Sequence, residues 1–347
     1  MIRSSYYQDL TKMNTFGMRV KARCFMEYDS VADLVDIEFE ELARPVLHIG
    51  GGSNLLFTDD FKGTVLHSKI DFIEIIEVSS DDVLVSVGSG VVFDQFCEWA
   101  AKEGLWGVEN LSYIPGEVGA SAVQNIGAYG VEVKDIIKKV YCYDTQEEEF
   151  VHFDVEECGY GYRDSIFKDP EIKGRYIVTH VVFQLSLTPQ PKLDYGHLND
   201  AVNAAAGDGA LTPALIRRVI IKIRKEKLPE PSVMGSAGSF FKNPVISPEH
   251  FARIEAAAKA EHGPDYKVPH YDLPDSTVKI PAAWMIEQCG WKGKRSGNAA
   301  VYDKQPLVIV NYTGDAYPEE IIGLEKRIID SVERKFDIEL HPEVEHI

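Results

Sequence analysis

The sequence has no long hydrophobic run and little positive charge. Each of these absences excludes a class of protein. No uninterrupted apolar stretch among its 347 residues is long enough to span a bilayer. Lysine and arginine number 36 against 55 aspartates and glutamates, so the formal net charge is −19. Because general nucleic-acid binding needs clustered basic residues, we expect neither a membrane protein nor a nucleic-acid-binding protein.

Cysteine is scarce and poorly arranged for disulfide or metal chemistry. The five cysteines form no CxxC pair and no Cys/His cluster with zinc spacing, so free thiols and no metal site are expected. Residues 1–12 also lack the basic start, apolar core and cleavage site of a signal peptide. The sequence therefore favours a cytoplasmic protein, and it indicates no obligate protein partner.

Strand and helix signals alternate along the sequence. Its length suggests two or three domains. Segments rich in β-branched residues predict strands at 45–49, 72–77, 83–87 and 175–187. Apolar residues at helical spacing predict helices at 92–102, at 215–227 and from Pro318 onwards. Pro229 disfavours helix at the residue before it, so a domain boundary is placed there. The alternation predicts an α+β fold.

Two stretches of glycine and other small residues are typical of a dinucleotide site. Glycine lets backbone N–H groups approach an anion closely. The first stretch is Gly50, Gly51, Gly52, Ser53 and Asn54. The second supplies Ile114, Pro115, Gly116, Gly119, Ala120, Ser121, Asn125, Gly127, Ala128 and Tyr129. Neither has the GxGxxG pattern, so a Rossmann nicotinamide site is not supported, and a tight turn would explain the first stretch taken alone.

Three polar residues stand in unusual sequence surroundings. Arg163 lies between aromatic residues and glycines, where a guanidinium can bind a carboxylate or phosphate, or simply pair with Asp164. Ser239 lies between a small-residue turn and two phenylalanines, but no GxSxG elbow marks it as an acyl-transfer nucleophile. Glu343 matters only if the C-terminal tail folds back into a cleft. Taken singly, each residue also fits a merely structural or solvated role.

In order and spacing these stretches resemble the UDP-N-acetylenolpyruvoylglucosamine reductases, the MurB family, over essentially the whole chain. The match runs from Asn14-Thr15-Phe16-Gly17 to Pro342-Glu343-Val344, and the stretch 193–198 looks like the tyrosine loop of the type I branch. The resemblance implies a two-part FAD-binding region of the PCMH-type flavoenzyme fold and a smaller α+β substrate-binding domain. The implied parts are 1–70 with the returning tail 339–347, then 71–227, then 228–338.

The resemblance also implies a reaction and its cofactors. NADPH would reduce FAD, and FAD would reduce UDP-N-acetylglucosamine enolpyruvate, a small-molecule UDP-sugar of peptidoglycan synthesis. Ser53 stands where related oxidases carry a flavin-linking histidine, so FAD is expected to be non-covalent. One departure is Ala120, where many family members have glycine; its extra methyl is expected to alter flavin packing only slightly.

The family's functional residues carry over to matching positions. Arg163 would clamp the substrate carboxylate, Glu343 would donate a hydrogen bond to it, and Ser239 would give a proton to the carbanion. Both small-residue stretches and Arg224 would bind FAD. The implied substrate contacts are Tyr162, Tyr195, Lys227, Asn243 and Gln288.

Two other functions stay open at this point. A different FAD oxidoreductase or oxidase on the same scaffold would be revealed by rapid reoxidation of its reduced flavin by oxygen, although Ser53 counts against it. A non-catalytic nucleotide-sugar or flavin binder would bind a UDP-sugar without turnover. The presence of Arg163, Ser239 and Glu343 together argues against the binder.

Overall fold

The computed structural model describes all 347 residues, which divide into two compact units. Unit 1 comprises Met1–Leu10, Val20–Gly52 and Asp60–Glu226, and unit 2 comprises Thr11–Arg19, Ser53–Asp59 and Lys227–Ile347. No helix combines the length and the apolar character needed to cross a bilayer. The division of residues 1–227 into two FAD-binding subdomains stays a prediction.

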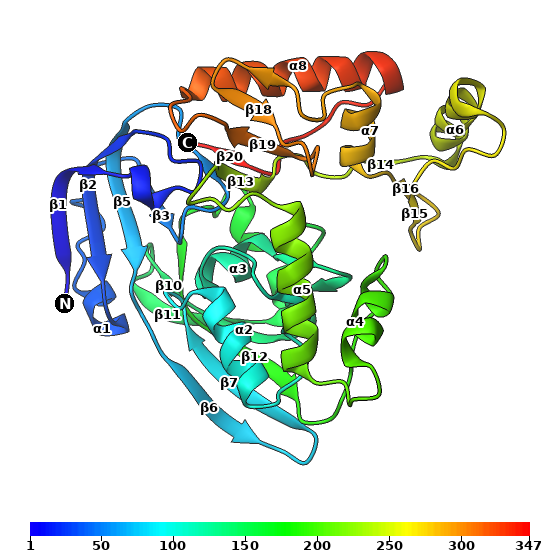
Figure 1. Ribbon diagram of the computed structural model, residues 1–347. Helices are drawn as coiled ribbons and strands as arrows, with labels where there is room; N and C mark the ends of the chain where they lie inside the picture. The colour runs from blue at the N-terminus through cyan, green and yellow to red at the C-terminus, as the bar shows by residue number, and fades with distance from the viewer. The chain divides into compact units, whose positions relative to one another are not determined.

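Unit 1 contains two large sheets (Figure 1). The five-stranded sheet is antiparallel throughout, and its order is β11 (Glu149–Asp154), β10 (Ile137–Asp144), β12 (Tyr176–Ser186), β7 (Asp82–Gly88) and β6 (Ile73–Val78). The four-stranded sheet has the order β1 (Arg3–Asp9), β2 (Lys21–Tyr28), β5 (Phe61–Ser68) and β3 (Val46–Ile49). In it β1 is antiparallel to β2, and the other pairs are parallel. The four predicted strands are confirmed.

The helices of unit 1 are α1 (Val31–Val35), α2 (Phe93–Lys102), α3 (Val118–Gln124), α4 (Leu198–Ala206) and α5 (Pro213–Lys227), which reaches unit 2 with its last residue. Shorter elements are η2 (Glu109–Leu111), η3 (Val133–Asp135), η4 (Val155–Cys158), η5 (Ile166–Lys168) and the strand pair β8 (Gly127–Ala128) and β9 (Val131–Glu132). The predicted helices at 92–102 and 215–227 are confirmed. An apolar stripe on α5 packs against α4.

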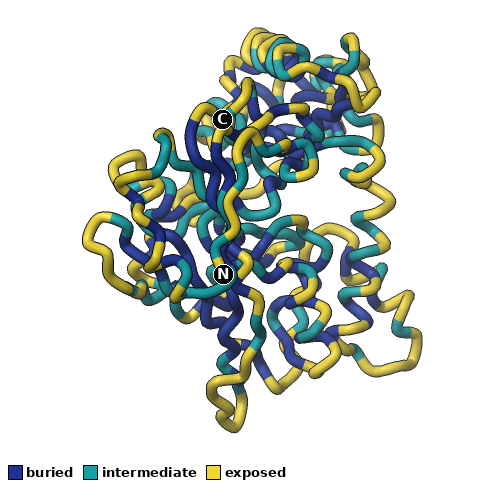
Figure 2. Tube along the Cα trace, turned by 90° about the vertical axis from the view of Figure 1, so that its left-hand side faces the viewer, coloured by how far each residue is buried: buried dark blue, intermediate teal, exposed yellow.

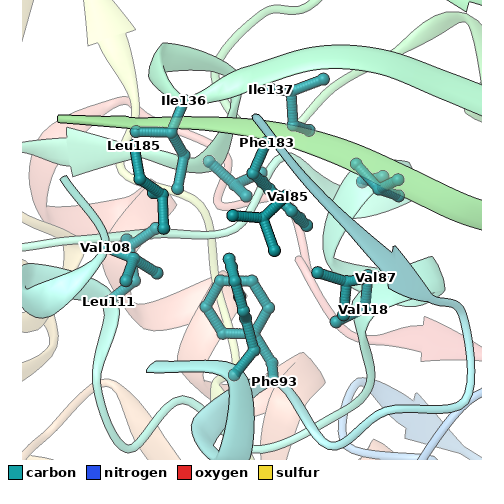
Figure 3. Packing of buried hydrophobic residues seen from close by; sticks show 14 of the residues in the cluster. Val85, Val87, Phe93, Val108, Leu111, Val118, Ile136, Ile137, Phe183 and Leu185 are labelled. Atoms are coloured by element: carbon teal, nitrogen blue, oxygen red, sulfur yellow. The ribbon is translucent and has the colours of Figure 1, made fainter. Parts of the chain in front are cut away.

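The core of unit 1 lies between the five-stranded sheet and helices α2 and α3. Figure 3 shows Phe93 of α2 and Val118 of α3 on the side of the sheet that carries Val85, Val87 and Phe183. All five side chains are completely buried, and each contributes about 1.5–3 kcal/mol by leaving water. This packing fixes α2 and also α3, which lies within the second small-residue stretch.

Helix α3 lies within the second small-residue stretch, where no helix is predicted from the sequence. Small residues bury little apolar area, but they let a helix approach its neighbours closely. A Cβ added at Gly119 would lie only 2.9 Å from the Cβ of Ser89, so glycine is required at this contact. The helix ends at Asn125, whose backbone is left-handed with φ of 44°. Small size therefore serves helix packing here as well as access for a ligand.

Unit 2 contains a four-stranded antiparallel sheet in the order β13 (Gly235–Ser239), β19 (Val308–Asn311), β18 (Ala299–Val301) and β17 (Arg295–Ser296). Its other strands are β14 (Val245–Ile246), β16 (Val278–Lys279) and β15 (Tyr271–Asp272), with β4 (Leu55–Leu56) paired in parallel to β20 (Glu345–His346). Its helices are η1 (Thr11–Met13), α6 (Pro248–His262), α7 (Ala282–Gln288) and α8 (Pro318–Phe336).

The predicted helix at Pro318 is confirmed as α8. Pro318 occupies the first turn, where the missing N–H of proline costs no helical hydrogen bond. Glu319 and Glu320 lie in the same turn, where the helix dipole favours negative charge. Strands β7, β12 and β19 are mostly buried, whereas β1 and β6 are mostly exposed. Figure 2 shows buried residues in dark blue and exposed residues in yellow along the chain. All five cysteines are free, as predicted.

Candidate active site

The two small-residue stretches meet in unit 1. Strand β3 ends at Ile49, and the turn that follows brings Gly51 against Gly116, whose Cα lies 3.4 Å from where a Cβ at Gly51 would stand. A Cβ at Gly50 would lie 3.1 Å from the Cβ of Ala120, so the extra methyl of Ala120 packs on this turn. Gly116 has φ of +116°, which a larger residue rarely adopts. Ser53 and Asn54 of the first stretch belong to unit 2.

Asn125 holds the second stretch in shape. Its Nδ2 donates to the carbonyl of Gly161 at 2.7 Å and to Oε2 of Glu132 at 3.1 Å, and its Oδ1 accepts from the backbone of Lys134 at 3.2 Å. The side chain is fully buried. Its amide is thus engaged within the fold, and it fixes the chain direction between α3 and β8.

Arg163 packs on the same stretch. Its Nη2 donates to the carbonyl of Gly127 at 2.8 Å and its Nη1 to that of Asn125 at 3.3 Å. The guanidinium carbon lies 5.4 Å from the centre of the Tyr162 ring. These contacts hold the plane of the guanidinium beside the glycine backbone.

Arg224 brings positive charge to unit 1 beside the second stretch. From α5 its Nε donates to the carbonyl of Tyr113 at 3.1 Å, and the guanidinium also donates to the hydroxyl of Tyr129. Burial lowers the pKa of Arg224, partly offset by the phenol of Tyr129. Because these bonding partners are neutral, a bound anion would gain strongly from this cation. Close glycine backbones and a half-buried arginine fit the diphosphate of a dinucleotide such as FAD.

Tyr195 lies beside the second stretch, in the loop that leads to α4. Its ring meets that of Tyr129 edge-on, with centroids 6.0 Å apart, and 45% of the residue is exposed. Buried Asn110 donates through Nδ2 to the carbonyls of Tyr129, at 3.0 Å, and Lys192, at 2.7 Å. One side chain therefore ties the tyrosine loop to the small-residue stretch.

In unit 2 the structure brings Ser239 and Glu343 close along the chain backbone. The N–H of Glu343 donates to the carbonyl of Phe240 at 2.8 Å, and Phe241 forms a bridge with Pro342. Phe240 and Phe241 are fully buried, which fixes the backbone that carries Ser239. Asn54 donates through Nδ2 to the carbonyl of Glu343 at 3.1 Å, so the tail is held at two points.

The other substrate residues predicted for unit 2 do not gather at one point. Asn243 accepts through Oδ1 from the N–H of Ala282 at 2.9 Å, at the start of α7. Gln288 ends α7, about 9 Å further along at 1.5 Å per residue, and its Oε1 meets Nε2 of His262 at 3.0 Å. Gln288 also lines a cavity between α6, α7 and α8. Lys227 is the exposed last residue of α5.

Sequence reasoning missed a buried ionisable cluster behind the Gly50 turn. His67 on β5 lies 3.0 Å from Oε1 of Glu117 through Nε2, and 3.0 Å from Oε1 of Glu27 through Nδ1. Burial alone would lower the pKa of His67, but the hydrogen bonds and charges of Glu117 and Glu27 outweigh it and raise the pKa. Glu117 caps α3, so the cluster links β2 and β5 to the second stretch. Partners so distant in the chain leave no local signal.

This cluster predicts a stability that falls as the pH rises. A histidine whose pKa is raised on folding stabilises fully below its unfolded value of about 6.5, and loses that effect as the pH passes the raised value. Lys69 opposes the charge of His67. Burial and the nearby His67 lower the pKa of His48 to about 3, so His48 adds no charge in this pH range, and Arg3 pairs with Glu27. We expect His67→Gln to cost roughly 1–3 kcal/mol at pH 6 and distinctly less at pH 9, measured by denaturant unfolding.

The control is His197→Gln, because the side chain of His197 is 99% exposed. It should cost little at either pH. A cost of His67→Gln that is the same at pH 6 and pH 9 would show that His67 is held neutral and contradict this prediction.

Comparison with known protein families identifies two domains and several full-length relatives. Residues 230–347 match the family model described as UDP-N-acetylenolpyruvoylglucosamine reductase, C-terminal domain, and residues 23–154 match an FAD binding domain. A UDP-N-acetylenolpyruvoylglucosamine reductase of Bacteroides fragilis (strain YCH46) is 51% identical over 339 residues, covering 97% of this chain and 98% of that protein. One from Porphyromonas gingivalis (strain ATCC 33277) is 44% identical over 351 residues, covering 100% and 99%.

A solved structure shows the same fold. The UDP-N-acetylenolpyruvylglucosamine reductase (MurB) from Thermus caldophilus superposes with a TM-score of 0.67 at 22% sequence identity, over 100% of this chain and 98% of that one. The sequence identities to the bacterial reductases extend over nearly the full length of each chain. The chain therefore belongs to the UDP-N-acetylenolpyruvoylglucosamine reductase family.

Proposed function

We propose that this chain reduces UDP-N-acetylglucosamine enolpyruvate to UDP-N-acetylmuramate, with NADPH as the hydride donor and non-covalent FAD as the cofactor. Membership of the reductase family and the FAD-binding domain support an FAD-dependent oxidoreductase that acts on a small UDP-sugar in peptidoglycan precursor synthesis. The observation that carries the proposal is the backbone hydrogen bond from Glu343 to Phe240, because it brings the chain at Glu343 beside the residue that follows Ser239 and so supports a joint role for Ser239 and Glu343. A cytoplasmic location and the lack of an obligate protein partner stay predictions.

The residues proposed to hold FAD are the two small-residue stretches and Arg224. FAD, when bound, supplies the chemistry of hydride transfer from NADPH to the double bond of the substrate. Gly51 and Gly116 let backbone approach the diphosphate, and Arg224 supplies the positive charge. Ser53 offers no imidazole for a covalent flavin link.

The remaining chemistry falls to the chain's own side chains. Reduction of the double bond builds negative charge beside the substrate carboxylate, and stabilising such charge is usually the largest catalytic effect. We assign Arg163 to the carboxylate as a planar two-pronged donor, and Glu343 to the same carboxylate as a further hydrogen-bonding group. Ser239 gives its proton to the carbanion carbon; a hydroxyl is a weak acid, but a carbanion is a strong base.

The residues proposed to contact the substrate are Tyr162, Tyr195, Lys227, Asn243 and Gln288. Tyr195 is assigned as a lid element, because it is exposed and its ring lies edge-on to that of Tyr129 in the second stretch. Lys227 supplies positive charge for the diphosphate. Asn243 and Gln288, at opposite ends of α7, suit an extended ligand.

The proposed function is tested with the two half-reactions. Purified protein is reduced with one equivalent of NADPH without oxygen, and the enolpyruvyl substrate is then added while the visible flavin bands are followed. Bleaching and recovery of the bands are expected. Bleaching without recovery would move the substrate elsewhere, rapid reoxidation by oxygen would favour an oxidase, and no flavin band after FAD reconstitution would leave a binding protein.

Arg224 offers a test of the FAD site itself. Arg224→Gln removes a charge-assisted contact worth about 1.5–3 kcal/mol, so we expect the Kd for FAD to rise roughly 10- to 100-fold. The Kd is measured by titrating protein stripped of FAD and following flavin fluorescence. Arg218→Gln, on the exposed side of the same helix, is the control and should change little. Equal Kd values for the two variants would remove Arg224 from the FAD site.

A further inference from the structure

Tyr113 has an unusual backbone conformation at the entrance to the second stretch. Its φ is +62°, in the left-handed region, where a large side chain crowds the backbone. Such a conformation persists only where the surroundings hold it, and often marks a functional site. Tyr113 precedes Ile114, Pro115 and Gly116, and Gly116 lies against Gly51. It therefore sets the course of the chain into the proposed FAD site.

Charged side chains hold the backbone of Tyr113 on both sides. The Tyr113 N–H donates to Oδ1 of Asp94, in the first turn of α2, at 2.5 Å. The Tyr113 carbonyl accepts from Nε of Arg224, on α5, at 3.1 Å. The ammonium of Lys225 also lies 5.2 Å from the centre of the Tyr113 ring. Two helices thus fix one peptide segment from opposite sides.

Asp94 is itself fixed by Arg217 of α5. The two Nη atoms of Arg217 bind the two carboxylate oxygens of Asp94, with Nη2 3.0 Å from Oδ2. The side chain of Arg217 is only 12% exposed and that of Asp94 26% exposed. A two-pronged, shielded pair of this kind fixes the plane of the carboxylate as well as its position. Arg217 and Arg224 lie two turns apart on α5, so one helix carries both supports.

We propose that Asp94 is a positioning residue for FAD. Held by Arg217, it keeps Tyr113 left-handed, so that Ile114 to Gly116 meet the diphosphate with their backbone and Arg224 is aimed at the same anion. Asp94 acts through Tyr113 rather than by contact with the cofactor. The inference rests on one part of the proposed function, namely that the second small-residue stretch binds FAD.

The test is FAD affinity, measured by titrating FAD-stripped protein and following flavin fluorescence. We expect Asp94→Ala to raise the Kd for FAD roughly tenfold or more, because the Tyr113 backbone loses its charged acceptor and relaxes. Glycine adopts a positive φ without crowding, so Asp94→Ala/Tyr113→Gly should regain most of the lost affinity. Glu98→Gln removes an exposed ion pair with Lys102 on the same helix, and should leave the Kd unchanged.

Asp94→Ala leaves Arg217 shielded without its carboxylate and can unfold the chain. Asp94→Ala/Arg217→Met removes both charges and is expected to fold, with the same loss of FAD affinity. An unchanged Kd in the folded variant, or a raised Kd that Tyr113→Gly does not restore, overturns the inference but leaves the proposed function intact. Failure of the wild-type protein to bind FAD overturns both.

Discussion

Replacing Ser239 with alanine is expected to leave reduction by NADPH intact and to slow reoxidation by the enolpyruvyl substrate about 10²- to 10⁴-fold, the usual contribution of a positioned proton donor. The reason is that hydride transfer from NADPH requires no proton from Ser239, whereas the substrate carbanion requires one. The neighbouring backbone is fixed by buried Phe240 and Phe241, so removal of one oxygen should not move the strand. Stopped-flow absorbance of the flavin under anaerobic conditions separates the two half-reactions.

The matched control for this variant is Ser236→Ala on the same strand, β13. Ser236 is 4% exposed, so its side chain is buried in the fold, and no catalytic or substrate role is assigned to it. It should affect stability more than either half-reaction. If Ser239→Ala reoxidises at the wild-type rate, or if NADPH reduction slows by the same factor as reoxidation, Ser239 is not the proton donor.

The elements that the sequence predicts well are those with a repeated local signal. Helix α8 begins at Pro318 with acids in its first turn, and α5 carries an apolar stripe that ends before Pro229. Strand β12 is long and rich in β-branched residues. In each case propensity, periodicity and end signals agree within one segment, so no distant partner is needed to define the element.

Helix α3 shows where local signals fail. Its composition of small residues reads as loop, because small residues bury too little apolar area to predict a packed helix. The helix forms since its glycine and alanines can approach Ser89 and the sheet closely, which only the folded neighbours reveal. In α3 the packing against neighbouring elements outweighs the weak local preference of its sequence for helix.

Contacts between distant segments could not be predicted from the sequence, because their partners lie far apart along the chain. Asp94 on α2 pairs with Arg217 on α5, and strand β20 pairs with β4, some 290 residues earlier. His67 likewise finds Glu117 only after β5 and α3 are in place. Single charged residues are most often solvated, so nothing in one sequence marks these as partners. Ser239 and Glu343 were found through the family resemblance, and their closeness in unit 2 through the structure.

Arg163→Lys is expected to slow substrate-driven reoxidation of the flavin roughly 10²- to 10³-fold, as loss of a charge-stabilising donor does elsewhere. Lysine keeps the charge, but as a single point it cannot offer a carboxylate two parallel hydrogen bonds. It also cannot bind the carbonyls of Asn125 and Gly127 with two separate nitrogens, so its position beside the glycine backbone is lost. Reduction by NADPH should continue, because that step develops no charge on the substrate carboxylate.

The comparison that makes this result specific is Arg175→Lys. Arg175 also makes a two-pronged contact, but with Asp144 at the β10–β11 hairpin, where no substrate role is assigned. Arg175→Lys should lower the unfolding temperature and leave both half-reactions near wild type. If Arg163→Lys, like Arg175→Lys, lowers only the unfolding temperature, then Arg163 serves to hold the backbone at Asn125 and Gly127 and does not act on the substrate. A selective loss of reoxidation would place the guanidinium on the developing charge, because anchoring of the glycine stretch alone affects both half-reactions through FAD.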